Sequence, residues 1–334
     1  MSKERYIFMK IRIGIVGYGN IGRGVEKVIP QNPDTELAAV FVRKNPERTI
    51  IKTPGARVYT FNDAKDLTDK IDVIILCCGS ATDLPEEGPK YAAMFNTVDS
   101  FDTHAVIPQY FEKINKAAAN KTAVIAAGWD PGIFSAMKML SEAILPDGAT
   151  YSFWGPGVSQ GHSNAIRKVA GVKDAVQYTI PSEKAVKEVR SGTNPQLTTR
   201  QKHTRECYVV PEENADLAKI ESDVKNMPYY FADYDTTVHF ITEEELLKNH
   251  SKMPQAGLVF RCGTTGENNE NKHTIDFSLK LDSNPEFTAS ILVAYARAAA
   301  RMSKEGSFGA KTVFDVPLSY LSPKDGGALI RELI

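Results

Sequence analysis

Apolar runs and amphipathic stretches alternate along the first part of this 334-residue chain. Runs rich in Ile, Leu and Val show little alternation with polar residues, which is typical of strands buried on both faces of a parallel sheet. Apolar residues at helical spacing fill the intervals, notably at 107–120. The predicted strands are residues 11–16, 37–42, 73–78, 96–100 and 124–127. This order predicts an α/β domain with a doubly wound parallel sheet, whose ligands bind beyond the carboxyl ends of the strands.

The pattern changes after a predicted helix at 134–144. Three later segments alternate residue by residue, and in the last of them Ile275 and Phe277 share one face while Asp276 lies on the other. Such alternation is typical of an antiparallel sheet with one solvated face. The alternating segments are 201–210, 229–241 and 271–281. We therefore predict a second, mostly antiparallel α+β domain.

The domain boundary is predicted near residue 130. An alanine-rich helix follows the second domain at 285–304, with Asn284 placed as its cap. We expect the C-terminal segment 285–334 to pack back onto the first domain. The expected domains are therefore 1–130 and 131–284.

The first predicted strand runs into Gly17, which begins a Gly-x-Gly-x-x-Gly pattern with Gly19 and Gly22. In a dinucleotide-binding domain the first glycine makes a tight turn, the second lets the backbone approach a pyrophosphate, and the third lets the next helix pack closely. The N-terminus of that helix offers N–H groups and its positive dipole end to the phosphates. Because a strand precedes the glycines and a helix and a second strand follow them, we interpret residues 1–130 as a Rossmann-type domain.

The end of the second predicted strand favours one dinucleotide over the other. NAD-binding domains usually place Asp or Glu there to bind the ribose 2′-hydroxyl. This chain has Arg43 and Lys44 instead, and the next carboxylate is at Glu47. A guanidinium binds a 2′-phosphate through paired hydrogen bonds, whereas a carboxylate ~4 Å from that phosphate would cost about 4 kcal/mol at a surface-like dielectric. We predict NADP(H) as the cofactor, and the alternative is a solvated basic turn.

Composition excludes several other classes of protein. The chain is 42% hydrophobic and 24% charged, and its net charge of −1 gives no field that would attract nucleic acid or an anionic membrane. The 4 cysteines suit neither a disulfide framework nor a zinc site, and the 6 histidines lack metal-ligand spacing, so we expect no metal. No apolar run is long enough for a membrane span, and residues 1–8 lack the features of a signal peptide. We expect a cytoplasmic protein in which 1–8 are a dispensable extension or reflect an alternative start.

Polar residues in loops after the predicted strands are placed to face a bound nicotinamide. Asp102 and Asp130 follow different strands and can converge on one substrate cation. Each aspartate alone is equally compatible with a helix cap or an Asx turn, and the proline after Asp130 favours that alternative. Trp129 either lines a pocket or packs in the core.

The second domain offers a place for an anion. A glycine-rich polar loop at 154–163 presents backbone N–H groups that can hold a carboxylate, unless it is an ordinary surface connection. Arg205 shares strand parity with Cys207 and Val209, so its side chain is predicted to face inward. A buried guanidinium needs an anion from the protein or from a ligand. Two carboxylates, an inward arginine and NADP together imply hydride transfer from the α-carbon of a zwitterionic amino acid.

Six sequence motifs are specific in combination. They lie at 16–20, 79–84, 98–102, 128–132, 153–163 and 281–290. Through them the chain resembles the meso-diaminopimelate D-dehydrogenase family along nearly its whole length. The resemblance implies NADP-dependent, reversible oxidative deamination at the D-centre of meso-2,6-diaminopimelate. The implied products are L-2-amino-6-oxoheptanedioate, which cyclises to tetrahydrodipicolinate, together with ammonia and NADPH, in lysine biosynthesis.

Position by position, the resemblance implies roles for individual residues. Asp102 and Asp130 would bind the reacting D-amino group and take part in catalysis, and Thr179, Arg205 and Asn284 would bind the distal L-end. The remaining implied substrate contacts are Trp129, Trp154, Ser159, Gln160, Gly161 and Gln255. The implied NADP contacts are Gly17, Tyr18, Gly19, Asn20, Ile21, Val42, Arg43, Lys44, Cys77, Cys78, Gly79, Ser80, Ser100, Phe101, Asp102, Ala127, Gly128, Trp129, Asp130 and Pro131.

The chain departs from the family pattern at two positions. Lys44 stands where the family usually has a second arginine, which keeps the charge but loses the planar fork. Gln255 stands where a histidine usually helps to hold the distal end. Glutamine can hydrogen-bond a carboxylate but brings no positive charge, so we expect a changed substrate affinity or selectivity.

Other proteins share this two-domain plan. A dihydrodipicolinate reductase or another small-molecule NADP reductase is less favoured, because neither a paired-histidine run nor a Glu-Lys-Pro motif occurs in the sequence. A cofactor-sensing regulator would bind NADP without turnover and would not need an inward Arg205. We expect a zwitterionic small molecule as the binding partner. We also expect a substrate-binding and dimerisation role for 131–284 in a homo-oligomer, a dimer or a hexamer, because its sheet is exposed.

Overall fold

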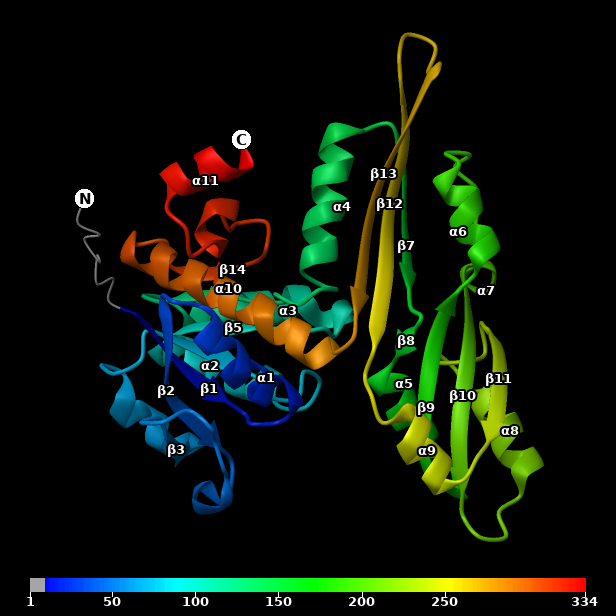
Figure 1. The fold of residues 1–334 in the computed structure, drawn as a ribbon, viewed down its shortest axis with the longest axis horizontal. Helices are drawn as coiled ribbons and strands as arrows, with labels where there is room; N and C mark the ends of the chain where they lie inside the picture. The colour runs from blue at the N-terminus through cyan, green and yellow to red at the C-terminus, as the bar shows by residue number, and fades with distance from the viewer. Residues whose placement is uncertain (1–9) are drawn as a thin grey trace. The chain divides into compact units, whose positions relative to one another are not determined.

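The computed structural model describes residues 10–334, so the expected extension at 1–8 lies outside the described part. The chain forms two compact units (Figure 1), and both ends of the sequence contribute to the first. Unit 1 runs to Ala136 and resumes with Pro285–Ile334, and unit 2 is Met137–Asn284. Unit 2 is thus an insertion into unit 1.

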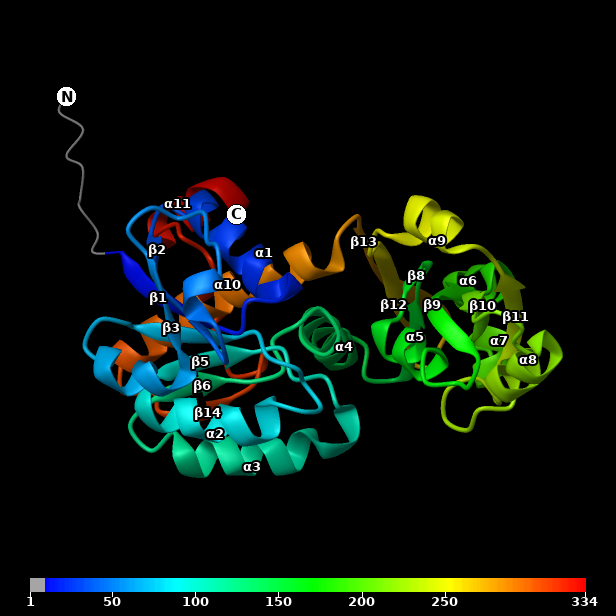
Figure 2. The ribbon, with the colours of Figure 1, turned by 90° about the horizontal axis from the view of Figure 1, so that it is seen from below.

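Unit 1 contains a sheet of seven parallel strands in the order β14-β6-β5-β4-β1-β2-β3. Helices α1 (Asn20–Val28) and α10 (Asn284–Lys304) cover one face, and α2 (Leu84–Met94) and α3 (Ile107–Ala117) cover the other (Figure 2). The strands are β1 (Ile11–Val16), β2 (Thr35–Val42), β3 (Arg57–Thr60), β4 (Val73–Leu76), β5 (Asn96–Asp99), β6 (Thr122–Val124) and β14 (Gly309–Lys311). The arrangement confirms the predicted Rossmann-type α/β fold.

Short helices occupy several connections of unit 1. The 3-10 helices are Ile29–Gln31, Pro46–Arg48, Phe61–Leu67, His104–Val106 and Leu318–Leu321, and α11 is Gly326–Leu333. The strand predicted at 124–127 is wrong in its bounds, because β6 ends at Val124. Ala126 has φ of 54°, in the left-handed region, so the extended conformation cannot continue through it.

Unit 2 contains a four-stranded sheet in the order β11-β10-β9-β8 and a three-stranded sheet in the order β13-β12-β7. The described strand pairs are antiparallel apart from β10 with β11, which confirms a mostly antiparallel α+β unit. The strands are β7 (Gly148–Trp154), β8 (Gly157–Val158), β9 (Val172–Pro181), β10 (His203–Pro211), β11 (Asp235–Phe240), β12 (Gln255–Thr265) and β13 (Asn271–Leu281). Helix α4 (Ile133–Ile144) begins in unit 1 and continues into unit 2. The other helices of unit 2 are α5 (Gln160–Ile166), α6 (Glu183–Arg190), α7 (Thr199–Lys202), α8 (Leu217–Lys225) and α9 (Glu243–His250).

The two long strands of the three-stranded sheet show why alternation predicted one of them and missed the other. In the edge strand β13, Ile275 and Phe277 are less exposed than Asp276 and Ser278, as the sequence predicts. β12 lies between β13 and β7 and is buried at most positions, so its sequence alternates little. Periodicity alone therefore does not identify β12.

A buried arginine attaches the C-terminal segment to the start of unit 1. Arg297 in α10 is 1% exposed, and its Nε and Nη2 donate to the two carboxylate oxygens of Asp34 at 2.6 and 2.7 Å. The same guanidinium donates to Asn32 Oδ1 at 2.7 Å and to the Leu321 carbonyl at 2.8 Å. Each partner lies in unit 1, so the charge is paired where water cannot reach it.

We predict that Arg297→Met destabilises the protein by about 3–5 kcal/mol, because it leaves Asp34 without its cation in a partly buried place. Thermal unfolding measures the effect, and each kcal/mol should lower Tm by about 2–4 °C for a unit of this size. Lys27→Met is the matched control. Lys27 of α1 forms an exposed ion pair with Glu286, which lies in α10 like Arg297. The control should change Tm little, since exposed pairs contribute about 0–1 kcal/mol. Equal shifts in the two variants would contradict the prediction.

Candidate functional site

The glycine-rich turn after β1 brings the start of α1 close to the end of β4. Gly17 has φ of 90°, and an added Cβ would lie 2.9 Å from the Cys77 carbonyl oxygen, so the turn requires glycine. A Cβ on Gly22 would overlap the Gly17 carbonyl, because α1 packs directly on the turn. Gly19 precedes α1 and is exposed, and no described atom lies within 4 Å of a Cβ built there. The turn leaves open the place that a pyrophosphate occupies at a helix N-terminus.

Tyr18 is held by a carboxylate in α1 that sequence analysis did not single out. The Tyr18 hydroxyl donates to Glu26, which is 5% exposed and also accepts from the N–H groups of Lys52 and Thr53 at 2.6 and 2.7 Å. Burial alone would raise the pKa of Glu26, but these donors hold it below its ordinary value. Ionised Glu26 therefore connects the turn to the segment before β3.

Arg43 at the end of β2 reaches the loop after β4. Its Nη2 lies 2.7 Å from Asp83 Oδ1, and its guanidinium lies over the ring of Phe61, 5.6 Å from the centroid. The other oxygen of Asp83 accepts from the Gly79 N–H at 3.1 Å. Arg43 and Lys44 are both exposed, so these cations stand beside the glycine-rich turn with their heads open to solvent.

Asp102 and Asp130 follow the neighbouring strands β5 and β6, at the carboxyl edge of the sheet. Asp102 is exposed, and its backbone N–H donates to Ser80 Oγ at 2.9 Å, which links this loop to the loop after β4. Asp130 is half-buried and precedes a cis peptide bond. Trp129 beside it packs edge-on against Phe134, with 5.3 Å between ring centroids. The edge that binds ligands in this fold thus carries both aspartates.

In unit 2, four residues form a row across the four-stranded sheet. Gly157 pairs with Thr179, Thr179 pairs with Arg205, and Arg205 pairs with Thr236 in the strand register. Residues paired in this way share a face of the sheet. Arg205 Nη1 donates to Thr179 Oγ1, and the guanidinium lies over the ring of Tyr234, 3.9 Å from its centroid. A cation and two hydroxyls therefore face the same side.

Arg205 is 5% exposed, as its strand parity predicts, and no ion pair joins it to an Asp or Glu in residues 10–334. Arg205 Nε, Gln177 Oε1 and Thr236 Oγ1 are among the buried polar atoms without a hydrogen-bond partner in that range. Burial lowers the pKa of Arg205, and burial together with the Arg205 charge lowers the pKa of His203 to about 3 and that of His162 to about 4. The cluster is positive and incompletely paired, which suits an anionic ligand.

Residues of the loop at 154–163 are oriented by histidines. The Trp154 N–H donates to His203 Nε2 at 2.9 Å, and the two rings stack with 5.4 Å between centroids. Ser159 Oγ lies 2.7 Å from His162 Nδ1. Both histidines are held neutral by the shifts described above, so they act here as hydrogen-bonding groups. The exposed predicted contacts of this loop are Trp154, Gln160 and Gly161.

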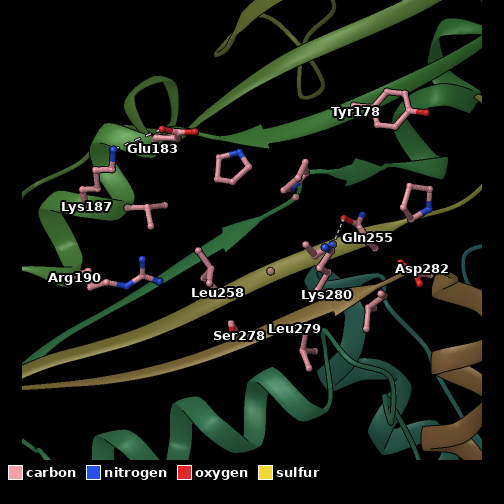
Figure 3. A pocket seen from close by; sticks show the side chains of 18 residues that line it. Tyr178, Glu183, Lys187, Arg190, Gln255, Leu258, Ser278, Leu279, Lys280 and Asp282 are labelled. Carbon is pink, nitrogen blue, oxygen red and sulfur yellow. Dashed lines mark hydrogen bonds and ion pairs between the residues drawn. The ribbon is translucent and has the colours of Figure 1, made fainter. Parts of the chain in front are cut away.

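Gln255 is buried, and both ends of its amide are hydrogen-bonded. Nε2 donates to the Val158 carbonyl and Oε1 accepts from the Ala256 N–H, each at 3.1 Å. The residue lines a cavity of about 620 Å³ between α6 and strands β12 and β13 (Figure 3). Thr179 and Arg205 do not line this cavity, but Gln255 lies directly against Gly157, the row residue that pairs with Thr179, and a Cβ built on Gly157 would overlap Gln255 Oε1.

Comparison with known proteins identifies the family. Residues 128–283 match the family model for the diaminopimelic acid dehydrogenase C-terminal domain, and residues 11–76 match the model for the dihydrodipicolinate reductase N-terminus. The chain is 61% identical to meso-diaminopimelate D-dehydrogenase of Acetivibrio thermocellus over 327 residues, covering 97% of this chain and 98% of that protein. The chain belongs to the meso-diaminopimelate D-dehydrogenase family. It is therefore an oxidoreductase, and the regulator alternative is wrong.

More distant members of the meso-diaminopimelate D-dehydrogenase family match over the same length. The Corynebacterium glutamicum enzyme is 45% identical over 324 residues, covering 96% of this chain and 98% of that protein. The crystal structure of that dehydrogenase in complex with DAP has a TM-score of 0.90 at 44% identity and covers 98% of this chain and 100% of its own. An engineered D-amino acid dehydrogenase bound to NADP+ has a TM-score of 0.84 at 43% identity, and the match covers 97% of this chain and 100% of that one.

In this meso-diaminopimelate D-dehydrogenase family member, Asn284 is the first residue of α10, and its N–H donates to the Met253 carbonyl at 3.0 Å. Sequence reasoning missed Glu26, Gln177 and Thr236, because a single polar residue in an otherwise ordinary helix or strand gives no periodic signal. In residues 10–334 no group of His, Cys, Asp and Glu is arranged to hold a metal ion, and the cysteines are free thiols. None of the helices in that range combines the length and apolarity needed to cross a bilayer.

Proposed function

We propose that this protein catalyses the NADP-dependent, reversible oxidative deamination of meso-2,6-diaminopimelate at its D-centre. The products are L-2-amino-6-oxoheptanedioate, which cyclises to tetrahydrodipicolinate, with ammonia and NADPH, and the proposed context is cytoplasmic lysine biosynthesis. The observation that carries the proposal is Arg205, a buried cation without a carboxylate partner among the described residues. A substrate with a second, distal carboxylate supplies the missing anion. The family's named substrate has such a group.

Different residues have different roles in this reaction. Asp102 and Asp130 bind the D-ammonium, and one of them, directly or through water, accepts the proton that the amine must lose before hydride leaves. Arg205 and Thr179 hold the distal carboxylate. Bound NADP+ supplies the hydride acceptor, and water hydrolyses the resulting imine to the oxo product and ammonia. Positioning of this kind can recover about 7–11 kcal/mol of the entropic cost of reaction.

Stereoisomers of the substrate test the reaction directly. We expect NADPH formation, followed by absorbance, with meso-diaminopimelate and little or none with the LL and DD isomers. Among the three isomers, only the meso form has both a D-centre, which Asp102 and Asp130 would bind, and an L-centre, whose carboxylate Arg205 and Thr179 would hold. Equal rates with all three isomers, or no turnover of the meso form, would refute the proposal.

Arg43 and Lys44 support NADP over NAD as the cofactor. They lie at the end of β2, beside the open helix N-terminus where the pyrophosphate would bind. Lys44 and Arg43 would hold the 2′-phosphate, with Arg43 supplying the planar fork.

We predict that Arg43→Ala raises the KM for NADP+ by roughly 10- to 100-fold, as expected for the loss of about 1.5–3 kcal/mol in a hydrogen bond to a charged group. The KM for NAD+ should change little, because NAD+ lacks the phosphate. Initial rates with both cofactors measure the ratio. Arg48→Ala, which alters an exposed arginine shortly after Lys44, serves as the matched control. Parallel changes for both cofactors would argue against a contact with the 2′-phosphate.

We predict that Arg205→Met raises the KM for meso-diaminopimelate by about 30-fold or more, because losing a charge-assisted pair to a buried carboxylate costs about 2–5 kcal/mol. The KM for NADP+ should stay near that of the wild type. Arg200→Met is the control, since Arg200 is exposed and pairs with Asp235 in the same unit. An unchanged KM in Arg205→Met would remove this residue from substrate binding.

A further inference from the structure

Asp99, the last residue of β5, is a buried carboxylate that the reaction described above leaves without a role. It is 1% exposed, and no ion pair joins it to a Lys or Arg among residues 10–334. Three hydrogen bonds take the place of a cation. Oδ1 accepts from the N–H groups of Phe101 at 3.0 Å and Ala126 at 3.1 Å, and Oδ2 accepts from the Tyr110 hydroxyl at 2.8 Å.

Two of these donors belong to the loops that carry the proposed ammonium-binding groups. Phe101 directly precedes Asp102, and Ala126 lies in the loop that leads from β6 to Asp130. Ala126 has φ of 54°, a conformation that costs free energy for a residue with a side chain and persists only where the surroundings hold it. The backbone adds a further link, because the Ala127 N–H donates to the Asp99 carbonyl at 2.8 Å.

Tyr110 of α3 holds the arrangement from the other side. Its ring stacks on that of Phe101, with 4.2 Å between centroids and 18° between planes. The loop that carries Asp102 is thus fixed through both the backbone and the ring of Phe101. The Asp99 oxygen that accepts from the Phe101 N–H also accepts from the Ala126 N–H in the loop that carries Asp130.

We propose that Asp99 is a positioning residue, which sets the Asp102 loop and the Asp130 loop in one arrangement through a shared carboxylate oxygen. The inference rests on the proposed roles of Asp102 and Asp130. Asp99 acts through the backbone of both loops and does not itself touch the substrate. Its contribution is therefore to the alignment of the amino group, on which the rate of hydride transfer depends steeply.

Protonation of Asp99 reverses one hydrogen bond of this arrangement and leaves the other two in place. Burial raises the pKa of Asp99 to about 6, against the lowering effect of its three hydrogen bonds. Below that pH Oδ2 can carry the proton and donate to the Tyr110 oxygen, while Oδ1 still accepts from both N–H groups. Burial raises the pKa of Tyr110 well above its ordinary range and that of Cys78, at the end of β4, to about 12, so neither changes charge near pH 6. The hold on the two loops is therefore kept when Asp99 takes up a proton near pH 6.

Substitutions at Asp99 separate positioning from a general structural role. Asp99→Ala should lower kcat with meso-diaminopimelate roughly 10- to 100-fold. Binding of adenosine 2′,5′-bisphosphate, which probes the distant end of the cofactor site, should be unchanged. Asp99→Asn should restore most of kcat at mildly alkaline pH, because its amide oxygen accepts from the same two N–H groups while its NH₂ donates to the Tyr110 oxygen.

Tyrosine variants complete the test. Tyr110→Phe keeps the ring stack and removes one donor, so it should lower kcat by a smaller factor. Tyr91→Phe is the matched control, because the buried Tyr91 hydroxyl bonds to the Phe61 carbonyl and not to Asp99, and kcat should be unchanged.

The outcomes distinguish the inference from the proposed function. Absence of NADP+ reduction by the wild type with meso-diaminopimelate would refute the function itself. Wild-type turnover combined with an undiminished kcat in Asp99→Ala, or with a kcat in Asp99→Asn no higher than in Asp99→Ala, would overturn the positioning role alone. Equal losses of kcat and bisphosphate binding in Asp99→Ala would also overturn it. If that variant does not fold, Tyr110→Phe against Tyr91→Phe decides the question.

Discussion

The pairing of Arg297 with Asp34 is the interaction on which the rest of unit 1 depends. The two residues come from opposite ends of the sequence. Arg297 is buried in α10, and the half-buried Asp34 lies directly before β2. A guanidinium so placed is tolerable only when its donors are occupied, and here Asn32 and the Leu321 carbonyl occupy the others. With α10 anchored, β14 can add to β6 and complete the sheet whose carboxyl edge carries the aspartates.

Two buried arginines in this chain show opposite ways of accommodating a charge. Arg297 is fully paired within the protein and serves stability. Arg205 has Thr179 and the face of Tyr234, and its Nε has no partner among the described residues. An unpaired buried polar group of this kind lowers the stability of the folded chain, and a bound ligand carboxylate would offset that loss by accepting a hydrogen bond from it. The difference in pairing, which strand parity does not show, separates a structural arginine from a candidate binding one.

Much of the fold could be predicted from local pattern, because each correct prediction rests on a short-range rule. The bounds of β1 and β13 follow from an unbroken apolar run and from strict alternation. β12 was missed, since a strand covered on both faces loses alternation, and the predicted strand at 124–127 ran too far because the backbone turns at Ala126. The site divides in the same way. Strand parity predicts that Arg205 faces inward. The roles of Glu26 and Asp99 cannot be predicted in this way, because their hydrogen-bond partners are distant in sequence or are brought to them by tertiary packing.

The insertion of unit 2 into unit 1 has a consequence for how the chain is made. Synthesis proceeds from the N-terminus, so the strands β7 to β13 of unit 2 are all translated before α10 and β14. Unit 2 can therefore complete its sheets early, whereas the edge next to β6 stays unpaired until Lys311 appears. The nucleotide-binding sheet, encoded first, is finished last. During translation the growing chain thus carries an open parallel sheet edge that only its own C-terminal segment closes.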